Sequence, residues 1–477
     1  MTDPAAPTNA IAAVWHPGDD QSRLTGTFSW EDDDGGIARL AGDLEQWPEG
    51  EFWPEMSVKH HDLLHASLNG QHYTLVDCRE TNSLTSADEY LPVSNVRCRS
   101  LVEGLLDSRD VVFGAVKFRL DDGDLWVGRH GIERTHLWKP VTSAQIQFTA
   151  AEDDIAGSWS ISDGLATSTD VAPQSVRLQR LSTFTYRPPE GLTLDAALDA
   201  VYAIEVLASL CCGRRISANT LRLEHATETW GTTAAGDPSP VFFSVFHRRW
   251  NHNGSPSKQG GDEPPPVTLA GLGGAQVLGR WMERHADIRS IASMVLADQQ
   301  NELRYLEQRY LNNALGAELL DRHENAKTDE GDVRSDPGQF DELVNQAIAG
   351  VGDDHRDELE RILQFANTPP LHQRLQRLAR NIDPDRKSMF AEVKHGTWAQ
   401  VAAAVRNGFT HQDGLASGDR FIHLHWLNES LRWVVLTNLV APLHPTAAET
   451  FLNSFNASGV AEEIGASVVA LSEHFGL

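Results

Sequence analysis

Six consecutive residues, Arg406 to His411, bring together side chains that are suited to metal-free RNA cleavage. Arg406 is a permanent cation whose planar donors can hold a phosphate and stabilise negative charge that builds up on it. His411 has an unperturbed pKa near neutrality, so it can take a proton from a ribose 2′-hydroxyl or give one to the leaving oxygen. Asn407 can orient either partner. Because an Arg and a His at this spacing also occur by chance, the motif by itself is weak support for catalysis.

Helical geometry sharpens this hypothesis. On a regular helix Asn407 and His411 lie on one face, and Arg406 starts about 100° away from Asn407. The long arginine stem can reach the same spot, especially if Gly408 loosens the helical turn. One motif presents only one imidazole, so acid–base cleavage would be easier if two copies met across a two-fold axis. The alternative interpretation pairs Arg406 with a nearby acid and makes His411 the cap of a helix C-terminus.

The elements that must position this motif are helical. Apolar residues recur at helical spacing through the second half of the chain. Asp336 followed by Pro337 predicts the start of one helix. The predicted helices are 277–296, 301–323, 337–350, 354–365, 371–381, 397–406, 421–440, 446–455 and 460–475.

The first half has a different pattern, in which short apolar runs alternate with Asp/Gly turns. One helix interrupts it at 192–210, with Thr193 as its N-cap and Gly213 just past its end. The strand-like runs include 72–76, 111–120, 125–128, 144–150 and 176–186. Runs this short suit a sandwich or a strongly curved sheet.

The predicted fold is therefore α+β and multidomain. Residues 1–250 form a β-rich, sandwich-like module, and residues 276–477 form an all-α helical bundle. Residues 251–275, which are rich in proline and glycine, are the predicted linker, which we expect to bury little apolar surface.

Charge limits the possible partners. The formal net charge of −27 argues against a general scaffold that coats nucleic-acid backbones. Residues 371–411 depart from this excess of acids, with seven basic and three acidic side chains. Such a locally basic stretch beside the motif would suit a phosphate substrate. A solvated helix face explains Arg374, Arg377 and Arg380 about equally well.

Cysteines and histidines add little chemistry. The four cysteines have no metal-ligand or disulfide spacing, and adjacent Cys211 and Cys212 are typical of buried free thiols. His60, His61 and His65 form the most metal-like cluster, but a zinc site needs further ligands, and surface or core histidines are the favoured interpretation. His423 and His425 are predicted to be structural, although His425 could supply a second imidazole. The sequence has no secretory signal pattern and no long apolar run, so we expect a cytoplasmic protein.

Three segments carry a resemblance to a known family. Residues 307–323 resemble the early helix of Apea-like HEPN domains, with the internal glutamate at Glu318. Residues 367–378 resemble the polar entry and basic helix found midway, and 405–411 resembles the Arg-Asn-x3-His signature. More loosely, strands around 75–78 and 138–140 are similar to the N-terminal module of ApeA-type proteins.

This resemblance implies a HEPN ribonuclease of the kind that acts in abortive infection against phage. It assigns the catalytic pair to Arg406 and His411, the accompanying polar residue to Asn407, and a nearby acidic residue to Glu318. It further implies a homodimer, or a higher homo-oligomer, that works without a metal or other cofactor. Gly408 departs from the family, in which many members have a bulkier residue.

The leading hypothesis is therefore a metal-independent endoribonuclease that cleaves a structured RNA, such as a tRNA, by attack of the 2′-hydroxyl. Its N-terminal module would bind a phage-derived trigger or restrain the nuclease. One alternative is a catalytically silent HEPN module for binding or dimerisation, joined to a ligand-binding β-rich domain. Another is a β-sandwich binding protein whose helical half only oligomerises.

Overall fold

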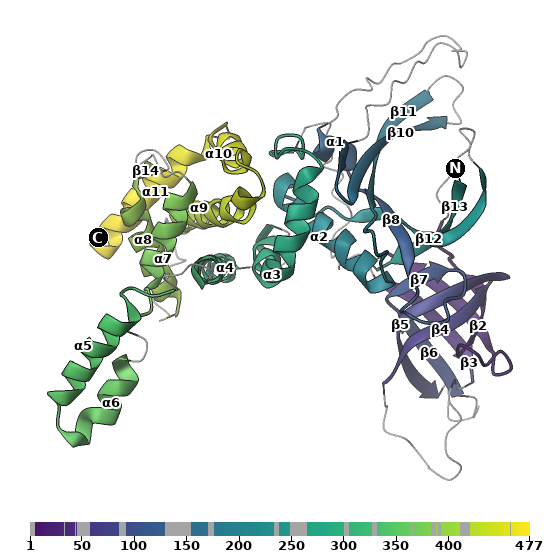
Figure 1. Cartoon of the computed structure of the whole chain (residues 1–477), viewed down its shortest axis with the longest axis horizontal. Helices are drawn as coiled ribbons and strands as arrows, with labels where there is room; N and C mark the ends of the chain where they lie inside the picture. The colour runs from purple at the N-terminus through teal and green to yellow at the C-terminus, as the bar shows by residue number, and fades with distance from the viewer. Residues whose placement is uncertain are drawn as a thin grey trace. The chain divides into compact units, whose positions relative to one another are not determined.

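The computed structural model divides the chain into two compact units (Figure 1). The β-rich unit comprises Met1–Glu205 and Ile216–Pro264, and the helical unit comprises Val206–Arg215 and Pro265–Leu477. The structure describes residues 5–32, 34–42, 44, 58–84, 92–128, 154–169, 176–232, 238–248, 265–299, 305–326, 332–363, 366–382, 388–389, 393–410, 420–457 and 459–477. The β-rich module and the helical bundle predicted from the sequence are both confirmed.

A closed antiparallel barrel forms the first part of the β-rich unit. Its strand order is β4-β1-β2-β3-β6-β5, and pairing of β4 with β5 closes the ring. The strands are β1 (Ala10–Trp15), β2 (Leu24–Glu31), β3 (Gly35–Ala41), β4 (Lys59–Leu68), β5 (Gln71–Leu84) and β6 (Pro92–Cys98). The sequence was compatible with either a sandwich or a strongly curved sheet. The closed ring is the strongly curved sheet.

Side-chain alternation explains how the barrel is filled. Along β1, Ala10, Ala12 and Val14 are buried, whereas Ile11 between them is 75% exposed. This period of two sends every other side chain into the barrel, where it packs against the buried residues of the other strands. Asn69 and Gly70, both with positive φ, make the two-residue turn between β4 and β5, as an Asn-Gly pair does in hairpins.

The same sheet continues beyond the barrel in the order β7-β13-β12-β8-β11-β10-β9. Its strands are β7 (Ser100–Glu103), β8 (Phe113–Leu120), β9 (Asp154–Ala156), β10 (Trp159–Thr169), β11 (Val176–Tyr186), β12 (Ala218–Thr232) and β13 (Pro238–His247). Helix α2 (Leu194–Cys212) begins as predicted, with Thr193 Oγ1 accepting from the Ala196 backbone N–H at 3.3 Å. Gly213, with φ of 67°, follows its end.

Two local predictions were wrong. Residues 125–128, expected as a strand, lie in and directly after helix α1 (Gly123–Val127). Asp122 turns the chain with φ of 53°, and fully buried Trp126 stacks on Phe184 with ring centroids 5.7 Å apart. The expected linker is described from Pro265 onward, and there Val267 and Leu272 are at most 1% exposed. This end of the segment therefore does bury apolar surface, in the helical unit.

The rest of the helical unit consists, in the described chain, of nine α-helices, of which α9 is central and contacts α3, α4, α7, α10 and α11. Seven consecutive residues of α9, from Val434 to Val440, are buried, as expected for a central helix. The helices are α3 (Gln276–Gln299), α4 (Leu306–Ala326), α5 (Pro337–Ala349), α6 (Asp353–Leu363), α7 (Leu371–Ile382), α8 (His395–Thr410), α9 (Arg420–Val440), α10 (Ala447–Ala457) and α11 (Val460–Phe475).

Helices α5 and α6 form a hairpin that stands apart from the other helices in Figure 1. The two helices contact each other, and α5 contains no buried residue. The predicted start of α5 is confirmed, because Asp336 Oδ1 accepts from the Gln339 backbone N–H at 3.0 Å and Pro337 follows it.

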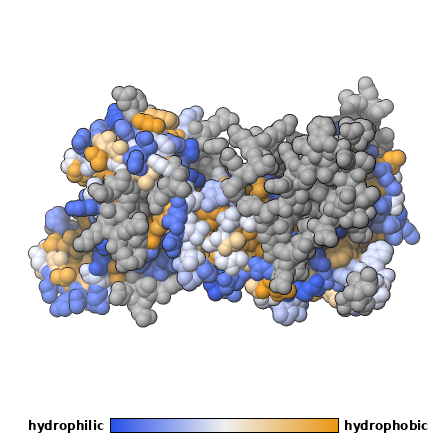
Figure 2. All heavy atoms as spheres, turned by 90° about the horizontal axis from the view of Figure 1, so that it is seen from above, coloured by the Kyte–Doolittle hydropathy of each residue, from blue (hydrophilic) through white to orange (hydrophobic). Residues whose placement is uncertain are grey.

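The surface and the thiols are those of an ordinary globular chain. Figure 2 shows hydrophilic and hydrophobic residues intermixed on the described part of one face. All four cysteines are free and buried, which confirms the interpretation of Cys211 and Cys212. In the described part of the chain, the helices are too short or too polar to cross a bilayer.

Candidate active site

Arg406 and Asn407 lie on the last turn of α8, which ends at Thr410. Trp398, Val401 and Val405 form the buried face of this helix, so the chain is anchored one residue before the motif. Asn407 is exposed and Arg406 is half-buried. The Arg406 Nη1 donates to Asn407 Oδ1 at 3.4 Å, a long hydrogen bond that links the two side chains.

His411, the third member of the motif, lies outside the described residues, as do 412–419. The helix remains regular through Gly408, which is buried, up to Thr410. The Thr410 hydroxyl donates to the Asn407 carbonyl oxygen at 2.8 Å. The expected loosening of the turn at Gly408 is therefore not seen in the described part of the motif.

Tyr310 of α4 holds α8 in place. Its side chain is fully buried, and its hydroxyl donates to the Ala402 carbonyl oxygen at 2.8 Å, one turn before Arg406. The Tyr310 ring also meets Phe409 edge-on, with centroids 5.5 Å apart. Burial raises the pKa of Tyr310 well above its usual range, so the phenol stays protonated as a donor. Tyr310 thereby contacts α8 on both sides of Arg406 and Asn407, through the Ala402 backbone and the Phe409 ring.

Glu318 has a different partner from the one expected. It accepts a hydrogen bond from Arg322 of its own helix at 2.6 Å, and the Arg322 side chain is 50% exposed. Glu318 also lies two turns along α4 from Tyr310, a rise of about 12 Å. The structure thus brings Arg406 and Asn407 together, and it places Glu318 in a surface ion pair on α4.

Two arginines of the basic stretch before the motif are neutralised by acids, which corrects the expected phosphate-attracting face at these two positions. Arg374 is 0% exposed, and Arg377 is partly buried. Both pair with Asp321 and Asp332: Arg374 Nη1 lies 3.2 Å from Asp321 Oδ2, and Arg374 Nη2 lies 2.6 Å from Asp332 Oδ2. Arg380 alone of the three α7 arginines is exposed. Neither a substrate-binding face nor a solvated face describes Arg374, which is a core residue.

Burial raises the pKa of Asp321, and the guanidinium groups of Arg377 and Arg374 only partly offset this effect. Burial also acts to raise the pKa of Asp332, but the hydrogen bonds and charges of Arg374 and Arg377 together outweigh it, so this pKa is lowered. The arginines therefore outweigh the effect of burial on the pKa of Asp332 but not on the pKa of Asp321.

The histidines of α9 behave as structural residues. His423 Nδ1 lies 3.1 Å from the Ser467 hydroxyl of α11. His425 is partly buried, and its ring lies against the neighbouring Trp426 with centroids 5.0 Å apart. These contacts favour the structural interpretation of both residues.

The metal-like histidine cluster of the β-rich unit separates onto different partners. His65 Nε2 lies 3.0 Å from the Leu106 carbonyl oxygen, and His61 Nε2 lies 2.8 Å from Glu80 Oε2. His60 is exposed. Within the described residues no three metal-binding side chains converge.

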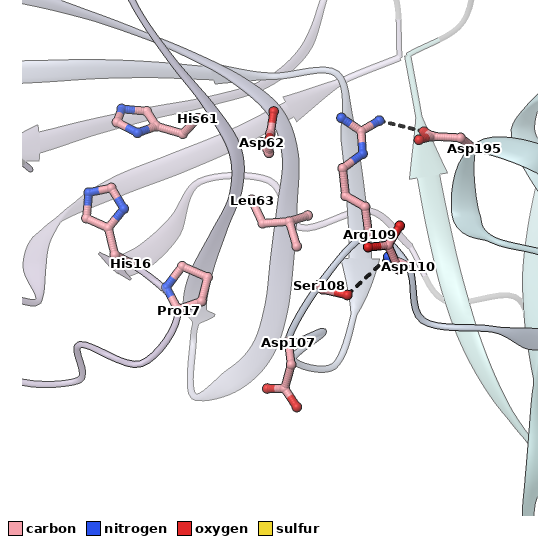
Figure 3. Close-up of a pocket in the computed structure, with 10 residues that line it drawn as sticks. All are labelled: His16, Pro17, His61, Asp62, Leu63, Asp107, Ser108, Arg109, Asp110 and Asp195. Atoms are coloured by element: carbon pink, nitrogen blue, oxygen red, sulfur yellow. Dashed lines mark hydrogen bonds and ion pairs between the residues drawn. The ribbon is translucent and has the colours of Figure 1, made fainter.

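His61 also lines an open, polar pocket of about 730 Å³, which is within the usual range for small-ligand sites. Figure 3 shows His16 beside His61, with ring centroids 5.1 Å apart, and Arg109 turned toward Asp195. Arg109 bridges two acids, at 2.5 Å from Asp195 and 2.6 Å from Asp77. Glu80 behind His61 is completely buried and accepts from Ser94 at 2.7 Å, so this imidazole is held in a fixed orientation.

The fold and the site define a two-part protein, in which a barrel-containing β-rich unit is joined to a HEPN-type helical unit. Two family models match: ApeA N-terminal domain 1 over residues 10–281, and Apea-like HEPN over residues 312–444. The chain therefore belongs to the ApeA family, and its HEPN domain supports a nuclease-type role in defence. No curated protein and no solved structure is significantly similar to it.

Sequence reasoning missed the residues that support the motif. Tyr310 lies in a segment that the family resemblance covered, yet its role depends on a contact with Ala402 in a helix 92 residues away. The role of Trp398 also depends on a residue of another helix, because its indole donates to the Ser430 hydroxyl of α9 at 2.8 Å. The sequence signal that could have identified both residues is an aromatic side chain with a polar tip at a core-facing helical position.

Proposed function

We propose that this protein is a metal-independent endoribonuclease whose active site is formed by Arg406, Asn407 and His411. The observation that carries the proposal is the Apea-like HEPN match over 312–444, which contains the whole motif. The half-buried Arg406 and exposed Asn407 on one turn of α8 support it, because a substrate can reach them from solvent.

The chemistry requires two proton transfers. An imidazole of His411 removes the proton from the ribose 2′-hydroxyl, and the resulting oxygen attacks the adjacent phosphorus. Arg406 stabilises the extra charge on the phosphorane, and Asn407 holds the guanidinium in place. The 5′-oxygen leaves with a proton from the imidazole of a second copy of the chain. The products are a 2′,3′-cyclic phosphate and a 5′-hydroxyl.

This two-imidazole mechanism is the reason for proposing a homodimer. A structured RNA, such as a tRNA loop, is the proposed substrate, because recognition by local shape and splayed bases tolerates the net charge of −27. The cellular role is abortive infection against phage. Glu318 enters the proposal as an acidic neighbour of the motif, with its ion pair to Arg322 as the competing structural role.

The decisive experiment is expression of the full chain with Arg406→Ala or His411→Ala during phage infection. We expect both variants to lose protection and to leave cellular RNA intact. Arg380→Ala is the matched control, since it removes an exposed arginine of the same unit and should protect normally. If both motif variants protect as well as the parent, the nuclease proposal is wrong and the silent HEPN module is favoured.

The pocket of the β-rich unit is the proposed site for a phage-derived trigger. It is polar, has the size of a small-ligand site, and contains side chains held by partners, such as Arg109 between Asp77 and Asp195. Arg109→Ala should abolish phage-induced RNA cleavage while leaving the cleavage by overexpressed protein unchanged. Equal induction in parent and variant would contradict a trigger role for this pocket.

A further inference from the structure

Three arginines of the barrel project outward from neighbouring strands. Arg39 lies on β3, Arg79 on β5 and Arg97 on β6, and all three are exposed. On each strand the residues directly beside the arginine are buried, such as Cys78 and Glu80 around Arg79. The alternation along the strands therefore places the three guanidinium groups on the outer surface of the barrel.

The register brings these cations close together. Arg79 and Arg97 are directly paired across β5 and β6. Their Cβ atoms are thus about 5 Å apart, a position where two like charges destabilise a sheet. Ile37 pairs with Arg97, so Arg39, two residues along β3, is its diagonal neighbour at about 7–8 Å. We name these three residues the barrel arginines.

Acidic side chains do not compensate this cluster in the described structure. Strands β3 and β6 contain no Asp or Glu, and Asp62, the acid of the neighbouring strand β4, lines the polar pocket. The two acids of β5 are engaged elsewhere: Glu80 is buried inside the barrel with His61 and Ser94, and Asp77 pairs with Arg109. Among the described residues, no carboxylate forms an ion pair with a barrel arginine. Repulsion between Arg79 and Arg97 is therefore unrelieved there.

Such a cluster is unusual in a chain with a net charge of −27. Guanidinium groups at strand spacing match a ligand that carries closely spaced anions, and the planar fork of arginine suits phosphate oxygens. An RNA backbone has this charge density. The helical unit cannot supply the same attraction through Arg374 and Arg377, because Asp321 and Asp332 neutralise them. A polyanionic substrate needs a cationic contact elsewhere on this acidic protein.

We propose that the barrel arginines form an RNA-binding face, which contacts the phosphate backbone of the RNA on which the HEPN unit acts. This inference rests on the proposed nuclease function for the identity of the ligand. The barrel arginines are not among the residues that line the polar pocket. The RNA-binding face does not recognise the base sequence of the RNA, because contacts to phosphates position an RNA without identifying its bases.

The test measures RNA binding without cleavage. Full-length protein with His411→Ala, which keeps the Arg406 guanidinium, is titrated into a fluorescently labelled tRNA pool, and anisotropy is followed from 0.05 to 0.3 M KCl. In this background Arg79→Ala/Arg97→Ala should lower the salt slope of log K by about 1.4, since each phosphate contact to a single strand contributes about 0.7. The same slope predicts about 25-fold weaker binding at 0.1 M salt.

Matched controls separate a specific face from a change in net charge. Arg356→Ala/Arg361→Ala removes two exposed arginines from α6 and should leave both slope and affinity unchanged. Arg79→Lys/Arg97→Lys should retain most of the salt slope, because the charges remain. Loss of the like-charged pair should not lower the melting temperature of the alanine double variant, which serves as the folding check.

Two results would overturn the inference. The first is that the cleavage-deficient background protein does not bind RNA. The second is that the barrel and α6 double-alanine variants bind RNA with the same affinity and salt slope. The second result would direct attention to an acidic protein as partner. Neither result depends on catalysis, which is measured separately by comparing RNA cleavage in the parent and in His411→Ala. Failure of the RNA-binding face is therefore distinguishable from failure of the nuclease proposal.

Discussion

Replacement of Arg374 by alanine tests whether the buried ion network between α4 and α7 holds the helical unit together. Arg374 donates to the Pro369 carbonyl oxygen at 3.0 Å, to Asp321 at 3.2 Å, and to both carboxylate oxygens of Asp332 at 2.8 and 2.6 Å. Its side chain and that of Asp321 are each 1% exposed. The substitution removes all of these donors at once and leaves Asp321 with Arg377 and with the Asn325 amide, which donates to Asp321 Oδ1 at 3.1 Å.

The expected loss of unfolding free energy is about 3–5 kcal/mol, the usual cost of removing one partner from a buried pair. This is a large part of the 5–15 kcal/mol that stabilises a typical domain. Arg322→Ala is the matched control: it breaks the pair with Glu318, but its side chain is 50% exposed, so we expect less than about 1 kcal/mol.

The assay is urea unfolding of the full chain followed by circular dichroism at 222 nm, a signal to which the helices contribute most. The double variant Arg374→Ala/Asp321→Ala should cost less than the sum of the two single variants, because each single change leaves a buried charge without its partner. If Arg374→Ala is no more destabilising than Arg322→Ala, the network contributes little and our account of α7 is wrong.

Three further outcomes are expected. Burial, and then Arg289, lowers the pKa of His285 to about 4, so its contribution to stability is complete above pH 6.5 and is lost as the pH falls from 6.5 toward 4. His285→Gln should therefore remove about 2 kcal/mol of the stability lost between pH 7 and pH 5, and a variant that loses as much stability as the parent over this range would contradict the assignment. Tyr310→Phe should cost about 1 kcal/mol and slow RNA cleavage without weakening tRNA binding, and unchanged cleavage would remove its positioning role. Cleavage should continue in excess EDTA, and a requirement for added Mg²⁺ or Zn²⁺ would argue against the imidazole mechanism.

Local signals in the sequence predicted the ends of elements well. Asp336 and Pro337 start α5, and Thr193 starts α2, because a cap depends on residues only three positions apart. The Asp/Gly turn between β2 and β3 also follows from neighbouring residues. The motif that begins on α8 was likewise recognised from contiguous residues, and the catalytic roles of Arg406, Asn407 and His411 stay predictions.

Long-range pairing could not be predicted from the same signals. Closure of the barrel depends on β1 meeting β4 and β3 meeting β6, and alternation along a strand does not specify its neighbours. Arg374 illustrates the same limit, since its acidic partners lie 53 and 42 residues earlier in the chain. The sequence of a basic helix alone therefore does not show whether its arginines contact phosphate, water or buried carboxylates.

Helix α2 limits how this protein can be divided experimentally. It is one continuous helix, yet Val206–Arg215 belongs to the helical unit while the residues before it belong to the β-rich unit. A fragment that starts at Pro265 would lack Leu207, Leu210 and Cys211, which are buried in the intact chain. It would also lack the Cys211 carbonyl oxygen that accepts from the Val267 backbone N–H at 3.3 Å. The helical unit is thus discontinuous in sequence, and insertion or loss of a segment between α2 and α3 must preserve both of its pieces.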